Sequence, residues 1–132
     1  MQFLNFDVDG FNLDQYLNFT IDTVPYLFRF RYNARDGWYV AIYDPTIFNK
    51  DAEDNKPAKL YGEVKVMPFQ NILKHTVSDK LPRGYLSFTD TKFQDFSNYA
   101  MPSFDNIGSG KRFQLTYFTY QESVAYGLEK YL

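Results

Sequence analysis

The chain has 132 residues and a hydrophobic content of 45%, values typical of one globular domain. Its formal net charge of -2 provides no positive field that would draw it to nucleic acid or to an anionic membrane. The absence of cysteine excludes disulfide scaffolds, thiolate metal sites and cysteine nucleophiles. Residues 1–14 lack a basic segment, and no stretch approaches the ~20 apolar residues that span a bilayer, so we expect a chain that is not exported and has no membrane partner.

The first two strands are predicted from alternation of apolar and polar side chains. Residues 16–22 place Leu17, Phe19 and Ile21 at every second position, which indicates a half-buried strand. Residues 26–35 repeat the pattern, with aromatic side chains on one parity and Arg29, Arg31 and Asn33 on the other. A period of two fits both segments better than the helical period of 3.6.

A hairpin is predicted around the Asp-Gly pair at 36–37, because this dipeptide favours the two-residue type I′ turn. A third strand then runs from Trp38 to Tyr43. In this register, Arg35 faces Trp38 and Phe30 faces Tyr43. One face of the hairpin is then apolar and aromatic, and carries Phe28, Phe30, Tyr32, Ala34, Tyr39, Ala41 and Tyr43.

The opposite face of the predicted hairpin combines cationic and apolar side chains: Arg29, Arg31 and Arg35 with Trp38, Val40 and Ile42. Two interpretations of this face stay open. It is either covered by another layer or a partner subunit, or it is a solvated row of arginines whose stems cover the aliphatic side chains.

The rest of the chain predicts further short strands separated by loops. In chain order, we expect a polar loop at 49–59, a strand at 60–67, one or two helical turns at 69–75, a strand at 85–89, a long loop at 90–111 and a strand at 113–120. We therefore expect a single mostly-β domain over residues 1–132, a small antiparallel barrel or sandwich with one short helix. Residues 1–14 are predicted as an N-terminal arm and residues 121–132 as a C-terminal tail.

The known catalytic and ligand-binding motifs do not match. His75 is the one histidine, and no Gly-x-Ser-x-Gly elbow accompanies it. The loop at 108–112 lacks the first glycine and the final Ser or Thr of a phosphate-binding loop, and the segment starting at Asp51 lacks the glycine and glutamate of a calcium loop. Aspartate pairs such as Asp90 and Asp95 are ordinary turn residues. No catalytic residue, metal ligand or cofactor-binding residue is predicted.

The order of the strand motifs resembles the small plug proteins of contractile phage tail baseplates, known from cyanophage-type and other myovirus tails. The matching stretches include Tyr-Leu-Phe-Arg-Phe-Arg-Tyr-Asn at 26–33, Trp-Tyr-Val-Ala-Ile-Tyr-Asp at 38–44 and Gly-Tyr-Leu-Ser-Phe-Thr-Asp-Thr at 84–91. An opening strand at 14–22, Asn-Ile-Leu at 71–73 and a closing strand with Arg112 complete the order. The chain departs from the family at Asp22-Thr23, where the family has Asp-Gly, and in its longer loop at 45–58.

The resemblance implies a virion component without enzymatic activity, built into the central baseplate near the hub and the tail tube. Its implied partners are other baseplate, hub and tail tube subunits, with several copies in a symmetric assembly, no cofactor and no specific nucleic acid. The implied location is the tail baseplate of the virion, and the host cytoplasm during assembly.

Large aromatic and guanidinium side chains contribute most to contact energies when they are desolvated. The predicted interface residues are therefore Arg29, Arg31, Arg35, Trp38 and Tyr39. The alternative function is a small β-barrel binding module that stacks a carbohydrate or a single-stranded nucleic acid on exposed aromatic rings. A small hydrolase that uses aspartates ranks last, because no nucleophile or oxyanion loop accompanies them.

Overall fold

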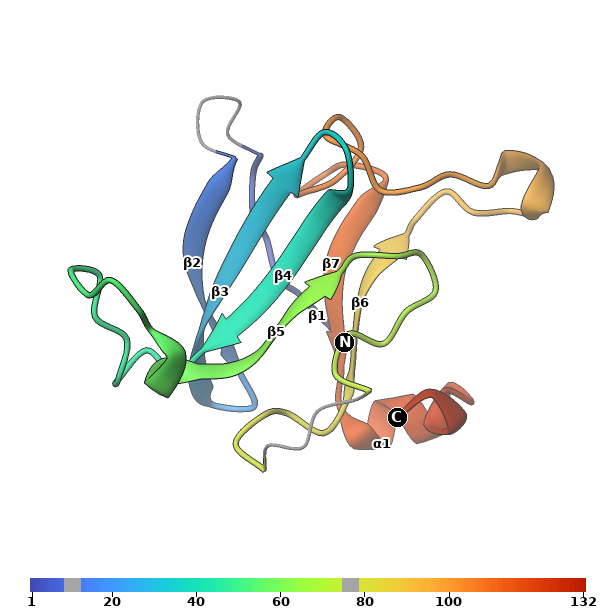
Figure 1. The fold of residues 1–132 in the computed structure, drawn as a ribbon. Coiled ribbons are helices and arrows are strands. Elements are labelled where there is room, and N and C mark those ends of the chain that lie inside the picture. Colours follow the sequence, from blue (N-terminus) through green and yellow to red (C-terminus); the bar gives the residue numbers. More distant parts are fainter. Residues whose placement is uncertain (9–12, 75–78) are drawn as a thin grey trace.

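Two antiparallel sheets pack face to face in a computed structural model that describes residues 1–8, 13–74 and 79–132 (Figure 1). One sheet has the strand order β2-β3-β4-β5, formed by Asp14–Ile21, Val24–Asn33, Gly37–Tyr43 and Lys59–Lys65. The other has the order β1-β7-β6, formed by Gln2–Phe3, Phe113–Phe118 and Tyr85–Asp90. The mostly-β prediction is confirmed, and the architecture is a sandwich of two sheets instead of a closed barrel.

The first residues of the chain join the three-stranded sheet. Gln2 pairs with Tyr117 in the ladder between β1 and β7, and the Leu4 amide donates to the Leu115 carbonyl at 2.9 Å. Phe6 is 3% exposed, and its ring stacks on Phe30 with centroids 4.4 Å apart. Part of the segment predicted as an N-terminal arm therefore belongs to the hydrophobic core.

The predicted register of the β3–β4 hairpin is wrong by three residues. Asn33 pairs with Gly37, the Asp36 amide donates to the Asn33 carbonyl at 3.2 Å, and Gly37 has a φ of +90°. The connection is therefore longer than the predicted two-residue turn, with the glycine in the left-handed conformation after it. Because side chains alternate between faces, a shift by an odd number exchanges the two faces of β4 relative to β3.

The corrected register places the side chains of Trp38, Val40 and Ile42 on the same face as Phe28 and Phe30. Both sheets contribute to the core that results. Its members that are at most 2% exposed are Ile21, Phe28, Phe30, Trp38, Val40, Ile42, Ile72, Leu86, Phe88, Ile107, Phe113, Leu115 and Tyr117. The rings of Phe30 and Phe88, on different sheets, lie 6.2 Å apart at an interplanar angle of 77°. Such edge-to-face pairs add about 0.5–1.5 kcal/mol beyond the area they bury.

A buried tyrosine joins the two sheets at one end of the sandwich. The Tyr117 hydroxyl donates to Asp22 Oδ2 at 2.8 Å and accepts from the Gly84 amide at 3.1 Å. Burial, followed by the hydrogen bond to Asp22, raises the pKa of Tyr117. A Cβ at Gly84 would lie 1.9 Å from the Phe118 carbonyl oxygen, so the close approach of the two backbones requires glycine there.

The short helix does not lie where it was predicted. In the described part of 69–75 the chain forms turns, and His75 lies outside the described residues. Asn71 explains the turns, because its Oδ1 accepts from the amides of Leu73 and Leu86, both at 3.1 Å, which ties the segment to β6. The predicted helical turns in this segment are wrong as far as the structure describes it.

The α-helix is α1, Tyr120–Ala125, and it starts with a capping box. Thr119 Oγ1 accepts from the Glu122 amide at 3.1 Å, and Glu122 Oε1 accepts from the Thr119 amide at 3.0 Å. Short 3-10 helices complete the fold: η1 at Lys56–Ala58, η2 at Phe96–Asn98 and η3 at Glu129–Tyr131. Within the described residues, none of these helices has the length and apolarity needed to cross a membrane.

Candidate interaction surface

The outer face of the four-stranded sheet carries a row of ion pairs that links strands β2, β3 and β5. Arg29 on β3 binds Asp14 on β2 through two hydrogen bonds, from Nε to Oδ1 at 2.8 Å and from Nη2 to Oδ2 at 2.6 Å. Glu63 on β5 lies between two arginines: its Oε1 is 3.8 Å from Arg29 Nη1, and its Oε2 accepts from Arg31 Nη2. We call Asp14, Arg29, Glu63 and Arg31 the ion-pair row.

The ion-pair row holds its arginines in defined positions. The side chain of Arg29 is 22% exposed, and its bidentate bond to Asp14 raises the pKa of the guanidinium above its usual value. Two carboxylates balance two guanidinium groups, so the row has no net charge. The outer face therefore offers oriented hydrogen-bonding groups without the positive field that binding to nucleic acid requires.

The structure separates the five predicted interface residues into three locations. Arg29 and Arg31 lie on the outer face together with Tyr39, which pairs with Arg31 across the β3–β4 ladder. Arg35 is exposed in the turn of the same hairpin. Trp38 is 2% exposed and lies in the core, where its Nε1 donates to the Ser103 carbonyl at 2.9 Å.

A second, smaller cluster covers part of the outer face. The segment after β4 folds back over the sheet, and the Asp44 amide donates to the Ala58 carbonyl at 2.7 Å where the loop closes. Beneath the loop, Leu27, Tyr43 and Ala58 are buried with Phe48 packed against them. The polar composition of 49–59 concealed this anchor, and the apolar pair Ile47-Phe48 between Pro45 and the polar stretch was the signal for it.

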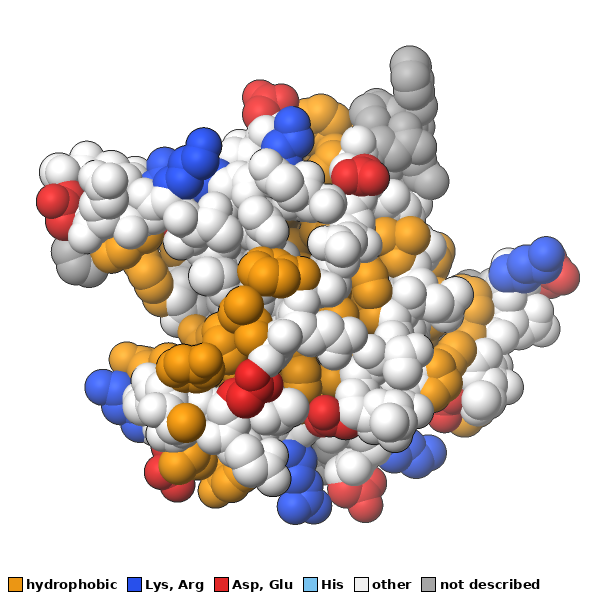
Figure 2. All heavy atoms as spheres, turned by 180° about the vertical axis from the view of Figure 1, so that it is seen from behind, with side chains coloured by type: hydrophobic (Ala, Val, Ile, Leu, Met, Phe, Trp, Pro, Cys, Tyr) orange, Lys and Arg blue, Asp and Glu red, His pale blue; other side chains and the backbone are white. Residues whose placement is uncertain are grey.

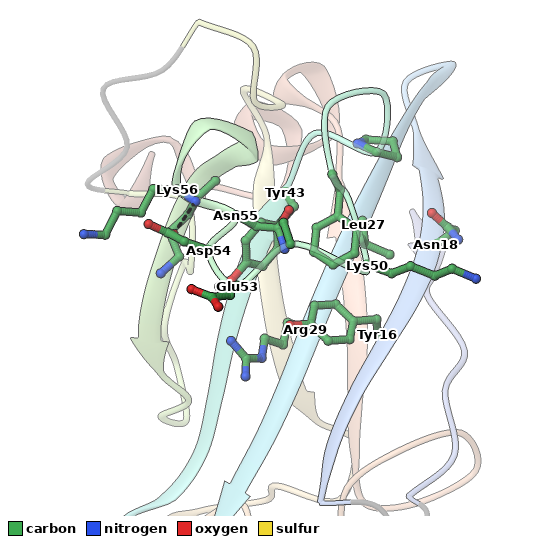
Figure 3. A pocket seen from close by; sticks show the side chains of 14 residues that line it. Tyr16, Asn18, Leu27, Arg29, Tyr43, Lys50, Glu53, Asp54, Asn55 and Lys56 are labelled. Carbon is green, nitrogen blue, oxygen red and sulfur yellow. Dashed lines mark hydrogen bonds between the residues drawn. The ribbon is translucent and has the colours of Figure 1, made fainter.

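The loop and the sheet enclose a groove of about 730 Å³ with an aromatic floor (Figure 3). The ring of Tyr16 lies 5.1 Å from that of Phe48 and 6.1 Å from that of Tyr43. Figure 3 shows Tyr16 and Arg29 on neighbouring strands below the loop, and the Arg29 guanidinium is 5.3 Å from the centre of the Tyr16 ring. Burial raises the pKa of the Tyr16 hydroxyl above its usual value.

The rim of the groove carries both signs of charge: Lys50, Lys56 and Lys59 with Glu53 and Asp54. The described residues that line it include no serine, threonine, cysteine or histidine. In the described part of the chain, no three His, Cys, Asp or Glu side chains are grouped so that they would hold a metal ion. The groups present are suited to stacking, hydrogen bonding and ion pairing with a bound chain.

The back of the molecule is different. Seen from behind, hydrophobic side chains gather where β1, the end of β7 and α1 meet, and charged side chains lie around them (Figure 2). Phe3, Val124 and Tyr126 are 46%, 42% and 65% exposed in this region, and the Tyr126 ring packs edge-on against Phe118 at 5.6 Å. The back of the sandwich thus carries an apolar patch at the end where α1 lies, whereas the outer face of the four-stranded sheet carries the ion-pair row and the aromatic groove.

A comparison with family models identifies the family. The model described as "Cyanophage baseplate Pam3 plug gp18" matches residues 1–121. The chain belongs to this baseplate plug family. The resemblance seen in the strand motifs is confirmed, and membership makes the chain a structural component of a phage tail baseplate in the virion, in contact with other baseplate components. No curated protein and no solved structure matches the chain.

The family match covers both sheets and the groove but ends at the start of α1. The ion-pair row, the aromatic floor and the hairpin all belong to the part shared with other plug proteins. Most of α1 and all of η3 lie in the segment predicted as a C-terminal tail, beyond the matched residues.

Proposed function

We propose that this plug protein occupies the centre of the baseplate, next to the hub and the tail tube, and acts by packing against these subunits without turning over a substrate. Family membership supports a structural role in the baseplate. The ion-pair row beside the aromatic groove is the observation that carries the proposal, because it places oriented guanidinium groups and tyrosine rings on one sheet face.

The outer face of the four-stranded sheet is the proposed contact surface, with Arg29, Arg31, Arg35 and Tyr39 as its contact residues. Asp14 and Glu63 already hold Arg29 and Arg31 in place, so these side chains lose little conformational freedom when a neighbour covers them. Trp38 supports the same face from inside, since it packs directly beneath the β3–β4 hairpin. Assembly in the host cytoplasm and several copies in a symmetric particle are part of this proposal.

Cross-linking of purified tails with a lysine-reactive reagent tests the location. The outer side of the four-stranded sheet carries Lys50, Lys59 and Lys65, whereas Lys111 and Lys130 lie elsewhere and serve as internal controls. We expect links from the first three lysines to hub and tube proteins, and few from the two controls. Absence of the chain from purified particles, or links from the control lysines alone, would contradict the proposal.

Substitution in the phage tests the contact residues. Arg31→Ala combined with Tyr39→Ala is expected to reduce incorporation of the plug into particles, while the purified variant keeps a cooperative unfolding transition. Arg83→Ala removes an exposed arginine from the turn before β6 and is the matched control. Equal incorporation of both variants would show that the contacts lie on another surface.

The aromatic floor of the groove supports one alternative, a binding site for a carbohydrate. Three rings line the groove, and carboxylates of Glu53 and Asp54 stand at the rim, an arrangement that suits sugar hydroxyls better than nucleic acid phosphates. Titration calorimetry with neutral oligosaccharides tests for this carbohydrate site, and titration with oligothymidine is the control for binding of single-stranded nucleic acid. Saturable binding of a sugar that is lost in Tyr16→Ala would favour the alternative.

A further inference from the structure

One edge of the four-stranded sheet carries unused backbone hydrogen-bonding groups. β2 is the first strand of this sheet, so β3 lies on one of its sides and none of the described strands lies on the other. The Tyr32 amide donates to the Leu13 carbonyl at 2.8 Å, and the register continues from this pair along both strands. Because direction alternates in an antiparallel ladder, residues 13, 15, 17 and 19 point their amide and carbonyl groups at β3. Tyr16 and Asn18 point theirs outward.

The side chain of Gln2 confirms the direction of the outward groups. Its Nε2 donates to the Thr20 carbonyl at 2.8 Å, and Thr20 has the same parity as Tyr16 and Asn18. Among the residues that the structure describes, no hydrogen bond reaches the outward amides or carbonyls of Tyr16 and Asn18. Both residues are exposed, and Tyr16 is 40% accessible.

The other long edge strands of the molecule are protected. β5 has an irregular register against β4 and carries Lys59, Glu63 and Lys65, features that discourage pairing with another chain. β6 is covered on its outer side, where the Ile72 amide donates to the Leu86 carbonyl at 2.8 Å. From residue 15 to residue 20, β2 has no charge, no proline and no bulge. An unprotected strand of this kind is a template for another strand.

We propose that β2 pairs with β2 of a second copy of this chain, antiparallel, about a two-fold axis at Leu17. In this register Tyr16 lies opposite Asn18 of the second copy, and the symmetry repeats the pair. All the outward amides and carbonyls of these two residues are then used, in four hydrogen bonds. No charged side chain faces another between residues 15 and 19, so the edge is complementary to itself, as a two-fold interface requires.

The side chains agree with this pairing. Leu17 and Phe19 are half-buried on the inner face, where they pack against the core, and Leu17 of one copy would meet Leu17 of the other at the axis. Tyr16 and Asn18 lie on the outer face and line the groove. Pairing would join two four-stranded sheets into one of eight strands, with both grooves on the same side. This pairing is a property of the chain alone and does not depend on the proposed location in the baseplate.

Sedimentation of the purified chain over a range of concentrations tests the pairing. We expect a reversible dimer. Asn18→Pro removes the outward amide without breaking a bond to β3, and should raise the dissociation constant about tenfold or more. Asn18→Ala keeps the amide and is the control, with an unchanged dissociation constant. A wild-type monomer at every concentration, or equal dimers of both variants, would overturn the proposal.

A cysteine substitution tests the register independently of proline. Because the chain has no cysteine, Leu17→Cys introduces one thiol per copy. At the axis the two Cα atoms would lie about 4.5 Å apart, within the range of a disulfide. In Phe19→Cys the two substituted positions would lie about 14 Å apart, beyond that range. Mild oxidation should therefore yield a covalent dimer of Leu17→Cys only, and failure of Leu17→Cys to cross-link, or cross-linking of both variants, would contradict the pairing.

Discussion

Arg112 holds the carboxylate of Asp90 with two parallel hydrogen bonds, from Nε to Oδ1 at 2.8 Å and from Nη2 to Oδ2 at 2.9 Å. The same Nη2 donates to the Asn98 carbonyl at 2.5 Å, so one side chain joins the end of β6, the start of β7 and the long loop between them. The Asp90 side chain is 4% exposed, and the Arg112 guanidinium holds the pKa of its carboxyl below the usual value.

Arg112→Ala is expected to destabilise the fold at neutral pH, because it leaves the buried Asp90 carboxylate without its bidentate partner. Since the pKa of Asp90 is lowered in the folded state, the stability from this pair is fully present above the unfolded pKa of about 3.9 and disappears as the pH falls through the folded value. Urea unfolding of both proteins at pH 7 and near pH 3 measures this. A difference in stability that stays constant across this range would contradict the assignment.

Thr23→Gly is expected to stabilise the protein by about 1 kcal/mol. Asp22 and Thr23 form the two-residue turn between β2 and β3 with φ values of 52° and 67°, and the left-handed region is costly for a β-branched side chain. The midpoint of urea unfolding reports the gain, and Thr20→Gly, a substitution in the neighbouring extended strand, should lower stability instead.

Trp38→Ala is expected to cost about 3–5 kcal/mol, because it removes a fully buried ring from the core. Tyr39→Ala, one residue later on the outer face, should cost about 1 kcal/mol or less. Denaturant unfolding of the two variants tests the register of the hairpin directly. With the two-residue turn predicted from sequence, the two side chains would exchange faces and the order of the losses would reverse.

Tyr117→Phe is expected to lower stability by about 1–2 kcal/mol, since Asp22 and the Gly84 amide lose their hydrogen-bonding partner. The pKa of Tyr117 is raised in the folded state, so the wild-type advantage is present below the unfolded pKa of about 10 and decreases as the pH rises above it. Unfolding at pH 8 and pH 11 measures the change. An advantage of equal size at both pH values would contradict a folded-state proton on this hydroxyl.

The alternation of apolar and polar side chains predicted the strands of this protein, because a period of two is recognisable within a segment of a few residues. All six predicted strands are present. β1 escaped prediction because two residues carry no period. The helix at 120–125 has a local signal in the sequence, the Thr-x-x-Glu of its capping box at 119–122.

The candidate surface was only partly predictable for a physical reason. Arg29 and Arg31 were identified from their residue type and parity, but their partners Asp14 and Glu63 lie on other strands, 15 and 32 residues away from the arginines they bind. The Asp-Gly pair alone predicts a register that places Trp38 on the arginine face, whereas the observed ladder places it in the core.

The mostly-β class, the succession of strands along the chain and the family could all be predicted from the amino-acid sequence, because alternation and turn residues are local patterns. The buried side of β4, the loop that covers the outer face and the sheet edge that pairs with none of the described strands became known from the three-dimensional structure. These features depend on the packing of large aromatic side chains between two sheets. A shift of three residues in the pairing register of the β3–β4 hairpin is enough to exchange the buried ring of Trp38 for the ring of Tyr39 on the surface.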